Sequence, residues 1–253
     1  MVISKDLFFM HKLITLTAAL LTCFWAATAF SAPPTSFSQA KRLLEKHIYP
    51  SEEYRETFYC GCSYNGEKQV DADSCGYEPR KNAKRGKRIE WEHIVPASRF
   101  GKTRACWTEG DPACTTKKGK SYKGRRCCSK VDEEFKRMEA DLHNLVPAVG
   151  ELNGDRSNFR MAVITGEDRT YGACDFEIDR ERKVAEPMAE TRGDIARIYL
   201  YMQETYGMPL TETEVEMFNQ WMAEDPVSEE EQLRDARILE IQGNTNPLIS
   251  VGF

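Results

Sequence analysis

Residues 88–97 read Arg-Ile-Glu-Trp-Glu-His-Ile-Val-Pro-Ala, and residues 141–159 read Asp-Leu-His-Asn-Leu-Val-Pro-Ala-Val-Gly-Glu-Leu-Asn-Gly-Asp-Arg-Ser-Asn-Phe. The apolar, β-prone run from Arg88 to Val95 predicts a strand, which Pro96 ends because proline cannot donate to a sheet. Leu142 to Pro147 predicts a second short strand, and residues 149–159 predict a helical segment directly after it. These stretches predict a strand–strand–helix unit at the centre of the fold.

Helical spacing predicts most of the remaining regular structure. The expected helices are Ser38–His47, Val131–Met138, Arg192–Tyr206, Thr213–Met222 and Glu229–Ile241. The strongest is Arg192–Tyr206, where four apolar residues form a core stripe: Ile195, Ile198, Tyr199 and Met202. Residues 101–129 are expected to form a long Lys-, Gly- and Cys-rich loop. Because no repeat or linker divides the chain, we expect one mixed α+β domain over residues 32–253.

The N-terminus has the layout of a secretory signal peptide. Lys5 and Lys12 precede an uncharged apolar run from Leu13 to about Phe30, and small residues follow as a cleavage pattern. We therefore expect residues 1–31 to be removed, with the cut near 29–32, and the protein to reach the periplasm or the medium. Two alternatives stay open: a retained membrane anchor, and a lipid attached at Cys23. Met10 is an alternative start.

Eight cysteines follow the signal segment, and an even number in an exported protein is typical of a disulfide framework. They are Cys60, Cys62, Cys75, Cys106, Cys114, Cys127, Cys128 and Cys174. A structural zinc site would need paired Cys-x-x-Cys spacings, which this chain lacks. The sequence alone does not choose among the 105 ways of pairing eight cysteines.

Charge is unevenly distributed along the chain, whose formal net charge is -5. Between Arg80 and Lys130 the sequence contains sixteen Lys and Arg residues and only four acidic residues. Between Glu204 and Glu240 it contains eleven acidic residues and two arginines. Such a polarised surface would steer a polyanion to one face. An ordinary solvated charge run is the alternative interpretation.

Histidines are scarce, which narrows the search for a catalytic base. Beyond the signal segment they are His47, His93 and His143, and only His93 stands beside an acid at the end of a predicted strand. We expect His47 and His143 to be structural. The chain has no Gly-x-Ser-x-Gly elbow and no His-Glu-x-x-His motif, so a serine hydrolase and a zinc peptidase are disfavoured.

The two opening stretches resemble the bacterial endonuclease I group of periplasmic and secreted nucleases, within the ββα-metal or His-Asn-His-like superfamily. Arg-Gly-Asp-Ile-Ala-Arg-Ile-Tyr at 192–199 and Gln-Gly-Asn-Thr-Asn-Pro at 242–247 match as well. The resemblance runs from about Phe58 to Ile249. It implies a ββα-metal finger at the centre of the domain and an endonuclease that cuts double- and single-stranded DNA, and RNA, without sequence preference.

The resemblance also implies a role for each candidate site residue. His93 is the general base, Glu92 and Asn153 are the metal ligands, and Asn144 orients the histidine. Arg125 holds phosphate, although the neighbouring Arg126 and Lys123 are further candidates for binding the substrate. Compared with the family pattern, residues 106–128 contain extra residues. Cys114 and Cys127 lie in this insertion and are our tentative disulfide pair.

This chemistry suits the residue types. A neutral imidazole accepts a proton near physiological pH. Mg²⁺ prefers oxygen donors and keeps several waters, so one carboxylate and one amide oxygen suffice, and Mn²⁺ is a possible substitute. Neighbours in a regular strand point to opposite faces, so Glu92 and His93 can converge only where the strand bends or ends.

Alternatives to catalysis remain at this stage. Each site residue also has a purely structural interpretation: His93 as a structural histidine, Glu92 as a salt-bridge partner, Asn153 as a turn residue and Asn144 as a local cap. The main alternative function is a non-catalytic, disulfide-rich nucleic-acid- or envelope-binding protein. We expect a monomer, with nucleic acid as its partner and no membrane contact after the signal is removed.

Overall fold

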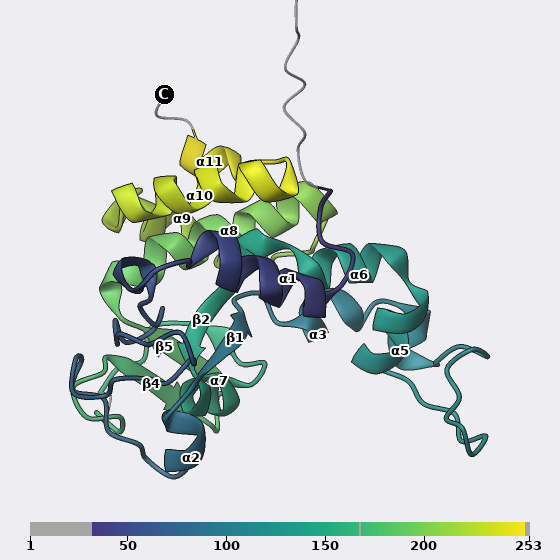
Figure 1. Ribbon diagram of the computed structural model, residues 1–253, viewed down its shortest axis with the longest axis horizontal. Coiled ribbons are helices and arrows are strands. Elements are labelled where there is room, and N and C mark those ends of the chain that lie inside the picture. The colour runs from purple at the N-terminus through teal and green to yellow at the C-terminus, as the bar shows by residue number, and fades with distance from the viewer. Residues whose placement is uncertain (1–31, 167, 251–253) are drawn as a thin grey trace, which may run out of the picture.

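Strand β1 (Ile89–His93) pairs antiparallel with β2 (Leu145–Val149), with Ile89 opposite Val149 and His93 opposite Leu145. Helix α7 (Gly150–Arg156) follows β2 at once. The computed structural model describes residues 32–166 and 168–250 (Figure 1). The expected signal segment 1–31 lies outside the described residues. The predicted second strand began at Leu142, but Leu142–Asn144 forms a 3-10 turn, so β2 starts three residues later.

The end of β1 is set by Asn144 and Pro96. The Asn144 carboxamide accepts from the Val95 N–H at 2.7 Å and donates to the Val95 carbonyl at 3.1 Å. The Ile94 N–H still donates to the Asn144 main-chain oxygen, and from Val95 onward the Asn144 side chain replaces the strand partner. Pro96 then caps α3 (Ala97–Gly101), so the chain turns away from the sheet. His93 is the last strand residue, which is where a departure from regular alternation is possible.

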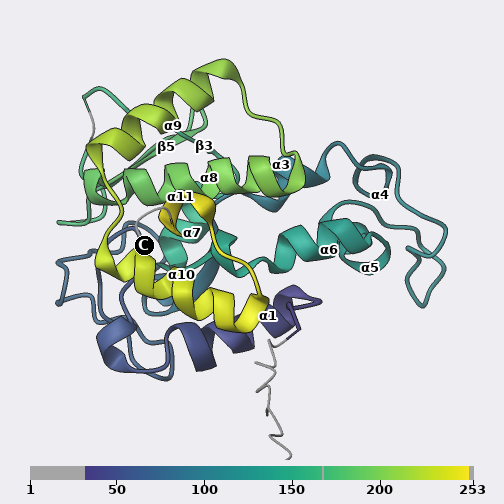
Figure 2. The same cartoon turned by 90° about the horizontal axis from the view of Figure 1, so that it is seen from above.

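The C-terminal helices form a layer over the β1–β2 pair (Figure 1). They are α8 (Arg192–Tyr206), α9 (Glu212–Glu224), α10 (Glu229–Gln242) and α11 (Pro247–Ser250). Figure 2 shows α8 lying between α9 and α10. The predicted stripe of α8 is confirmed, because Ile195, Ile198, Tyr199 and Met202 are all buried. Helix α8 has the predicted bounds and ends at Gly207, whose φ of 64° favours glycine.

A second, three-stranded sheet was not predicted. Its strands are β3 (Arg160–Met161), β4 (Phe176–Asp179) and β5 (Val184–Pro187), in the order β3-β5-β4. Strand β3 runs parallel to β5, and β4 runs antiparallel to it. The strands are two to four residues long, too short for an alternating pattern to stand out from the sequence.

The long segment after α3 is not the plain loop that we expected. It contains α4 (Ala105–Thr108) and the start of α5 (Arg125–Val131), after which α6 (Glu133–Ala140) leads back to the core. Between α4 and α5 the chain extends away from the rest of the molecule (Figure 1). A short helix α2 (Ala83–Gly86) precedes β1, and α1 (Phe37–Leu43) continues into a π-helical turn, Leu44–Ile48.

All eight cysteines of the described chain are paired, which confirms the disulfide framework. The bonds are Cys60–Cys174, Cys62–Cys75, Cys106–Cys128 and Cys114–Cys127. The tentative Cys114–Cys127 pair is therefore confirmed. Together with a single α+β domain, the framework agrees with the predicted fold class. None of the helices in the described residues has the length and apolar character needed to span a bilayer.

Removing the Cys60–Cys174 bond is expected to destabilise the protein more than removing Cys62–Cys75. The first closes a loop with a sequence separation of 114, and the second one of 13. Chain entropy predicts losses of about 4 to 5 and about 3 kcal/mol in the free energy of unfolding. Urea denaturation of the two double-serine variants measures both losses. A larger loss for the short loop would contradict the prediction.

Candidate active site

A cleft of about 930 Å³ opens beside the end of β1. Its walls come from α1, β1, α3 and α7, together with the first residue of α5. The lining includes four predicted site residues, Glu92, His93, Arg125 and Asn153. The structure thus brings side chains from three separate parts of the sequence to one cavity. Such a concave site with a few converging polar groups is the usual form of a binding site.

Glu92 is held by two donors on a single oxygen. The Tyr59 hydroxyl donates to Glu92 Oε1 at 3.1 Å, and Arg156 Nη1 donates to the same oxygen at 2.9 Å. Both of these bonds reach Oε1, and neither engages the other oxygen, Oε2. Burial raises the pKa of the Glu92 carboxyl, and Arg156 opposes this shift. The side chain is thus fixed in place through Oε1, at the edge of the cleft that it lines.

His93 is fixed by a main-chain carbonyl. Its Nε2 lies 2.8 Å from the Glu139 carbonyl oxygen, which can only accept, so Nε2 carries the proton and Nδ1 has the free lone pair. The Phe37 ring packs against the imidazole, with 4.8 Å between ring centroids. Burial, followed by the charge of Arg125, lowers the pKa of His93 to about 3. The imidazole is therefore neutral, with Nδ1 unprotonated.

Asn144 hydrogen-bonds the main chain beyond His93 and not the imidazole. Both of its side-chain hydrogen bonds go to the Val95 main chain, and its main-chain oxygen accepts from Ile94 N–H at 3.1 Å. It shapes the backbone after His93, so any orienting effect on the ring passes through the main chain. The direct contact is made by Glu139, which the sequence analysis did not single out.

Arg125 is the loop cation that reaches the cleft. Its Nε donates to Glu139 Oε1 at 2.5 Å, and Ser129 Oγ donates to Glu139 Oε2 at 2.7 Å. Lys123 instead donates to the Thr108 carbonyl, and the Arg126 guanidinium lies 4.2 Å from the Tyr122 ring centroid. Neither of these two lines the cleft.

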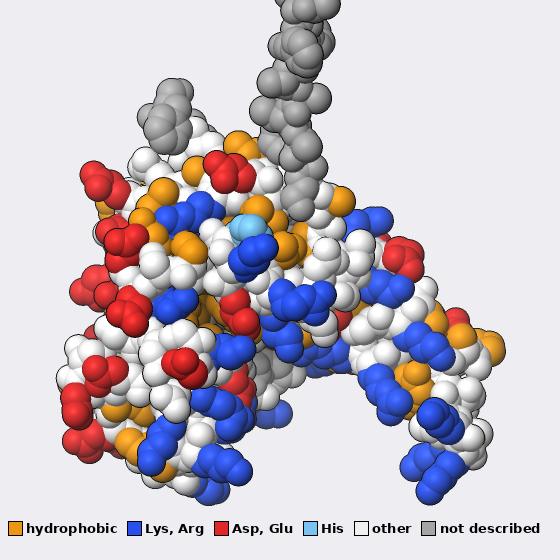
Figure 3. Space-filling view, viewed as in Figure 1, with side chains coloured by type: hydrophobic (Ala, Val, Ile, Leu, Met, Phe, Trp, Pro, Cys, Tyr) orange, Lys and Arg blue, Asp and Glu red, His pale blue; other side chains and the backbone are white. Residues whose placement is uncertain are grey.

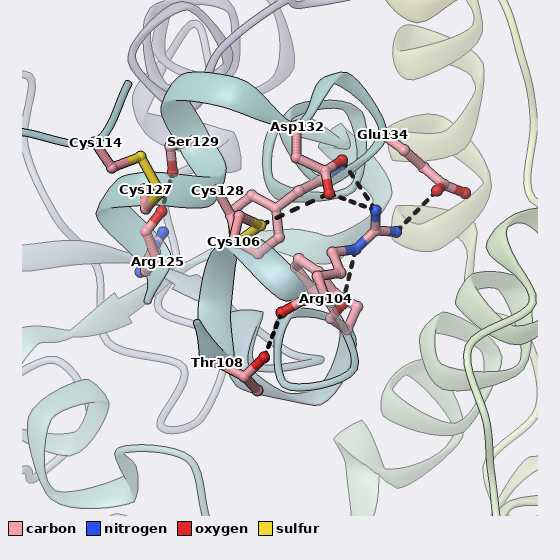
Figure 4. The surroundings of a disulfide bond; sticks show 12 residues. Arg104, Cys106, Thr108, Cys114, Arg125, Cys127, Cys128, Ser129, Asp132 and Glu134 are labelled. Carbon is pink, nitrogen blue, oxygen red and sulfur yellow. Dashed lines mark hydrogen bonds and ion pairs between the residues drawn. A yellow bond between two sulfur atoms is a disulfide. The ribbon is translucent and has the colours of Figure 1, made fainter. Parts of the chain in front are cut away.

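Two disulfides hold the helix that presents Arg125 (Figure 4). Cys128 of α5 is bonded to Cys106 of α4, and Cys127 to Cys114. At the other end of α5, Arg104 donates to both oxygens of Asp132 at 2.9 Å. The first turn of α5 is therefore cross-linked, although much of the Arg125 side chain is exposed.

Asn153 projects from the middle of α7 and is half-buried. Its side chain makes no hydrogen bond to the part of the chain that the structure describes. One carboxylate oxygen and one amide oxygen lining the same cleft form an oxygen donor set that fits a hard cation such as Mg²⁺, which keeps most of its waters. The described residues hold no cluster of three or more His, Cys, Asp or Glu residues suited to a metal. A zinc-type cage is thus absent from them.

Arg156 connects the two neighbours at the end of β1. Its fully buried guanidinium donates to Glu92, to the His93 carbonyl at 2.9 Å and to the Ile94 carbonyl at 2.6 Å. The sequence analysis quoted Arg156 within a motif but gave it no role. Its position could have drawn attention to it, because an arginine in the last turn of a helix that follows a buried strand points either to solvent or to the sheet. Only the fold shows which.

Charge is segregated on the face that Figure 3 displays. Lys and Arg side chains border the central hollow and lie along the extended arm, whereas Asp and Glu gather on the left. The view is the same as that of Figure 1, in which α2 lies at the bottom and α5 at the right. This agrees with the expected polarised surface.

Comparison with known proteins places this arrangement among nucleases. The family described as Endonuclease I matches residues 36–251. An extracellular deoxyribonuclease of Aeromonas hydrophila is 43% identical, covering 94% of this chain and 97% of the relative. A periplasmic deoxyribonuclease of the same species is 45% identical, covering 85% of each chain. Endonuclease-1 of Buchnera aphidicola is 43% identical, covering 76% of this chain and 73% of the relative.

Proposed function

The chain belongs to the endonuclease I family, and from this premise we propose that it hydrolyses phosphodiester bonds with His93 as general base and one divalent cation. It is a nuclease, and DNA is its substrate. The observation that carries the mechanism is that Glu92, His93, Arg125 and Asn153 line one cleft. RNA is proposed as a second substrate, because the phosphates that the cleft would bind are common to both polymers.

The proposed reaction begins with a water molecule beside His93. Nδ1 takes a proton from this water while the water oxygen forms a bond to phosphorus. One P–O ester bond breaks, and the leaving sugar oxygen keeps the electron pair and is protonated by solvent water. The Glu139 carbonyl keeps the proton on Nε2, so the imidazole presents the correct nitrogen. When a phosphate enters, its negative charge and its pairing with Arg125 raise the pKa of His93, which makes the base stronger once substrate is bound.

Arg125 serves as the phosphate-binding residue in this proposal. Its guanidinium is always charged and can contact two phosphate oxygens at once. Without substrate it is paired with Glu139, which keeps the buried carboxylate of that residue compensated. Because much of the Arg125 side chain is exposed, exchanging a carboxylate for a phosphate needs no opening of the core.

Glu92 and Asn153 are proposed as the protein ligands of Mg²⁺, with Mn²⁺ as a substitute. When bound, the cation supplies positive charge that neutralises the oxygens of the reacting phosphate. Glu92 is suited to this role because its Oε1 is already held by Tyr59 and Arg156. His93 has a different role, since its Nε2 is engaged by a carbonyl and its Nδ1 is needed for the proton.

Export to the periplasm or the medium is proposed from the signal-like segment 1–31 and from relatives named extracellular and periplasmic. The mature domain would then be residues 32–253, which N-terminal sequencing of the exported protein tests. An oxidising compartment agrees with four disulfides. We propose that the protein acts as a monomer.

In-gel digestion of DNA and RNA with and without EDTA tests the proposed function. We expect wild type to clear both gels in Mg²⁺ and to lose activity in EDTA, because the phosphate charge is then not neutralised. Glu92→Gln keeps the shape but removes the ligand charge and is expected to be inactive in Mg²⁺. Clearing that persists in EDTA would contradict the cation, and nucleic-acid binding without any cleavage would favour the non-catalytic alternative.

A further inference from the structure

Helix α1 and the turn after it present two different faces. Ala40, Leu44 and Ile48 are buried in the core beside β1. Four other residues, at positions i, i+3, i+4 and i+7 of the segment, line the active-site cleft: Ser38, Lys41, Arg42 and Glu45. This spacing puts them on one stripe. The stripe forms a wall of the cleft, although the sequence analysis gave this helix no function.

The stripe carries net positive charge. Glu45 is already neutralised, because Lys68 Nζ lies 2.7 Å from its Oε1 and the Trp91 indole N–H donates to the same oxygen at 3.3 Å. Lys41 and Arg42 have no hydrogen bond or ion pair with an acid among residues 32–166 and 168–250. By contrast, Arg125 is paired with Glu139. The cations of α1 are therefore available to an anion in the cleft.

Phe37 joins these cations to the catalytic centre. Its ring centroid lies 4.8 Å from that of His93, 4.8 Å from Lys41 Nζ and 5.2 Å from the Arg125 guanidinium carbon. One aromatic ring thus touches the proposed base and two cations. The positive charge of α1 begins next to the position where the scissile phosphate would lie, and it continues along the cleft to Arg42.

We propose that Lys41 and Arg42 form a subsite for a backbone phosphate adjacent to the scissile one, with Phe37 covering His93 between the two positions. This rests on the proposed function. Neighbouring phosphates on one strand rise only about 3.4 Å per nucleotide, so a strand seated at His93 must place further phosphates against a nearby wall. A cleft with unpaired cations on that wall binds such a phosphate without reading the base.

Salt-dependent binding in EDTA tests the subsite separately from catalysis. The ligand is a mixed-sequence 20-nucleotide single strand, and the variant is Lys41→Gln with Arg42→Gln. The slope of log K against log salt concentration is negative, and its magnitude is expected to be smaller in the variant. The decrease should be about 0.7 if the two residues share one phosphate and about 1.4 if they bind two. Affinity near physiological salt is expected to fall about tenfold, as for the loss of two exposed ion pairs.

Two further variants make the result specific. Lys46→Gln removes a charge from the same segment, but Lys46 is exposed and does not line the cleft, so the slope should match wild type. Lys41→Arg with Arg42→Lys keeps both charges and should retain the slope. Thermal melting by circular dichroism checks that each variant is folded.

Several outcomes would overturn the subsite. One is a salt slope in the Lys41→Gln, Arg42→Gln variant that equals the wild-type slope. Another is a change of slope in Lys46→Gln as large as that in the double variant, because binding would then depend on the overall charge of the surface and not on a subsite. In either case, wild-type cleavage in Mg²⁺ would leave the proposed function standing. Conversely, the wild type could fail to cleave while the double variant still shows a smaller salt slope than wild type. That pair of results would defeat the proposed function and keep the subsite.

Discussion

Replacing His93 with alanine is expected to slow hydrolysis about 10²- to 10⁴-fold, because the general base is lost. Cation affinity should remain nearly unchanged, since His93 Nε2 is engaged by the Glu139 carbonyl and the proposed ligands are Glu92 and Asn153. Removing the ring leaves space beneath Phe37 but no buried unpaired charge, because the imidazole is neutral. The fold should therefore survive.

Turnover of DNA and calorimetric titration with Mg²⁺ measure the two effects of His93→Ala separately. His47→Ala is the matched control, because His47 is half-buried, lies on the turn after α1 and does not line the cleft. It should cleave like wild type. If cation binding disappeared together with His93, the histidine would be a ligand and the assigned role would be wrong.

Arg156→Met is expected to lower the free energy of unfolding by about 3 to 5 kcal/mol, the usual cost of removing one partner from a buried ion pair. Glu92 would lose its charged partner while it stays buried. The His93 and Ile94 carbonyls would lose their donors as well, and unsatisfied buried carbonyls are costly. Because these carbonyls end β1, the variant should also cleave DNA more slowly even where it remains folded.

Urea denaturation measures the loss in Arg156→Met. Arg160→Met is the control, because Arg160 is exposed on β3 and its loss should change stability by less than about 0.5 kcal/mol. Adding Glu92→Gln to Arg156→Met should recover part of the lost stability, since the uncompensated charge is then gone. A loss below about 1 kcal/mol in Arg156→Met would show that the network does not hold the site.

The sequence predicted those parts of the fold whose signals are local. Helix α8 was predicted with the bounds that the structure shows, because its fifteen residues carry a regular apolar stripe. The run from Arg88 to Val95 was predicted as a strand that Pro96 ends, and the observed strand stops two residues earlier, at His93. The β3-β5-β4 sheet was not predicted, since β3 has only two residues and exists through pairing with β5. A pattern of two residues carries no periodicity.

The candidate site divides in the same way. Glu92, His93, Arg125 and Asn153 could be proposed from motifs and chemistry, because each lies beside recognisable neighbours in the sequence. The sequence does not show which of the basic side chains reaches the cleft. Arg126 and Arg125 are adjacent in the chain, yet one stacks on Tyr122 and the other reaches the cleft, because successive residues of α5 point in different directions.

By itself the sequence determined the helices with strong periodicity and the presence of a disulfide framework, and its motifs carried the family resemblance from which the candidate site residues were predicted. Only the tertiary structure decided which groups hold and surround those residues. Arg156 lies 64 positions from Glu92, and the Glu139 carbonyl lies 46 positions from the ring of His93. Phe37 reaches that ring from the first helix. Burial, hydrogen-bond partners and the pKa of a side chain depend on what packs around it, and packing joins residues that no local pattern connects.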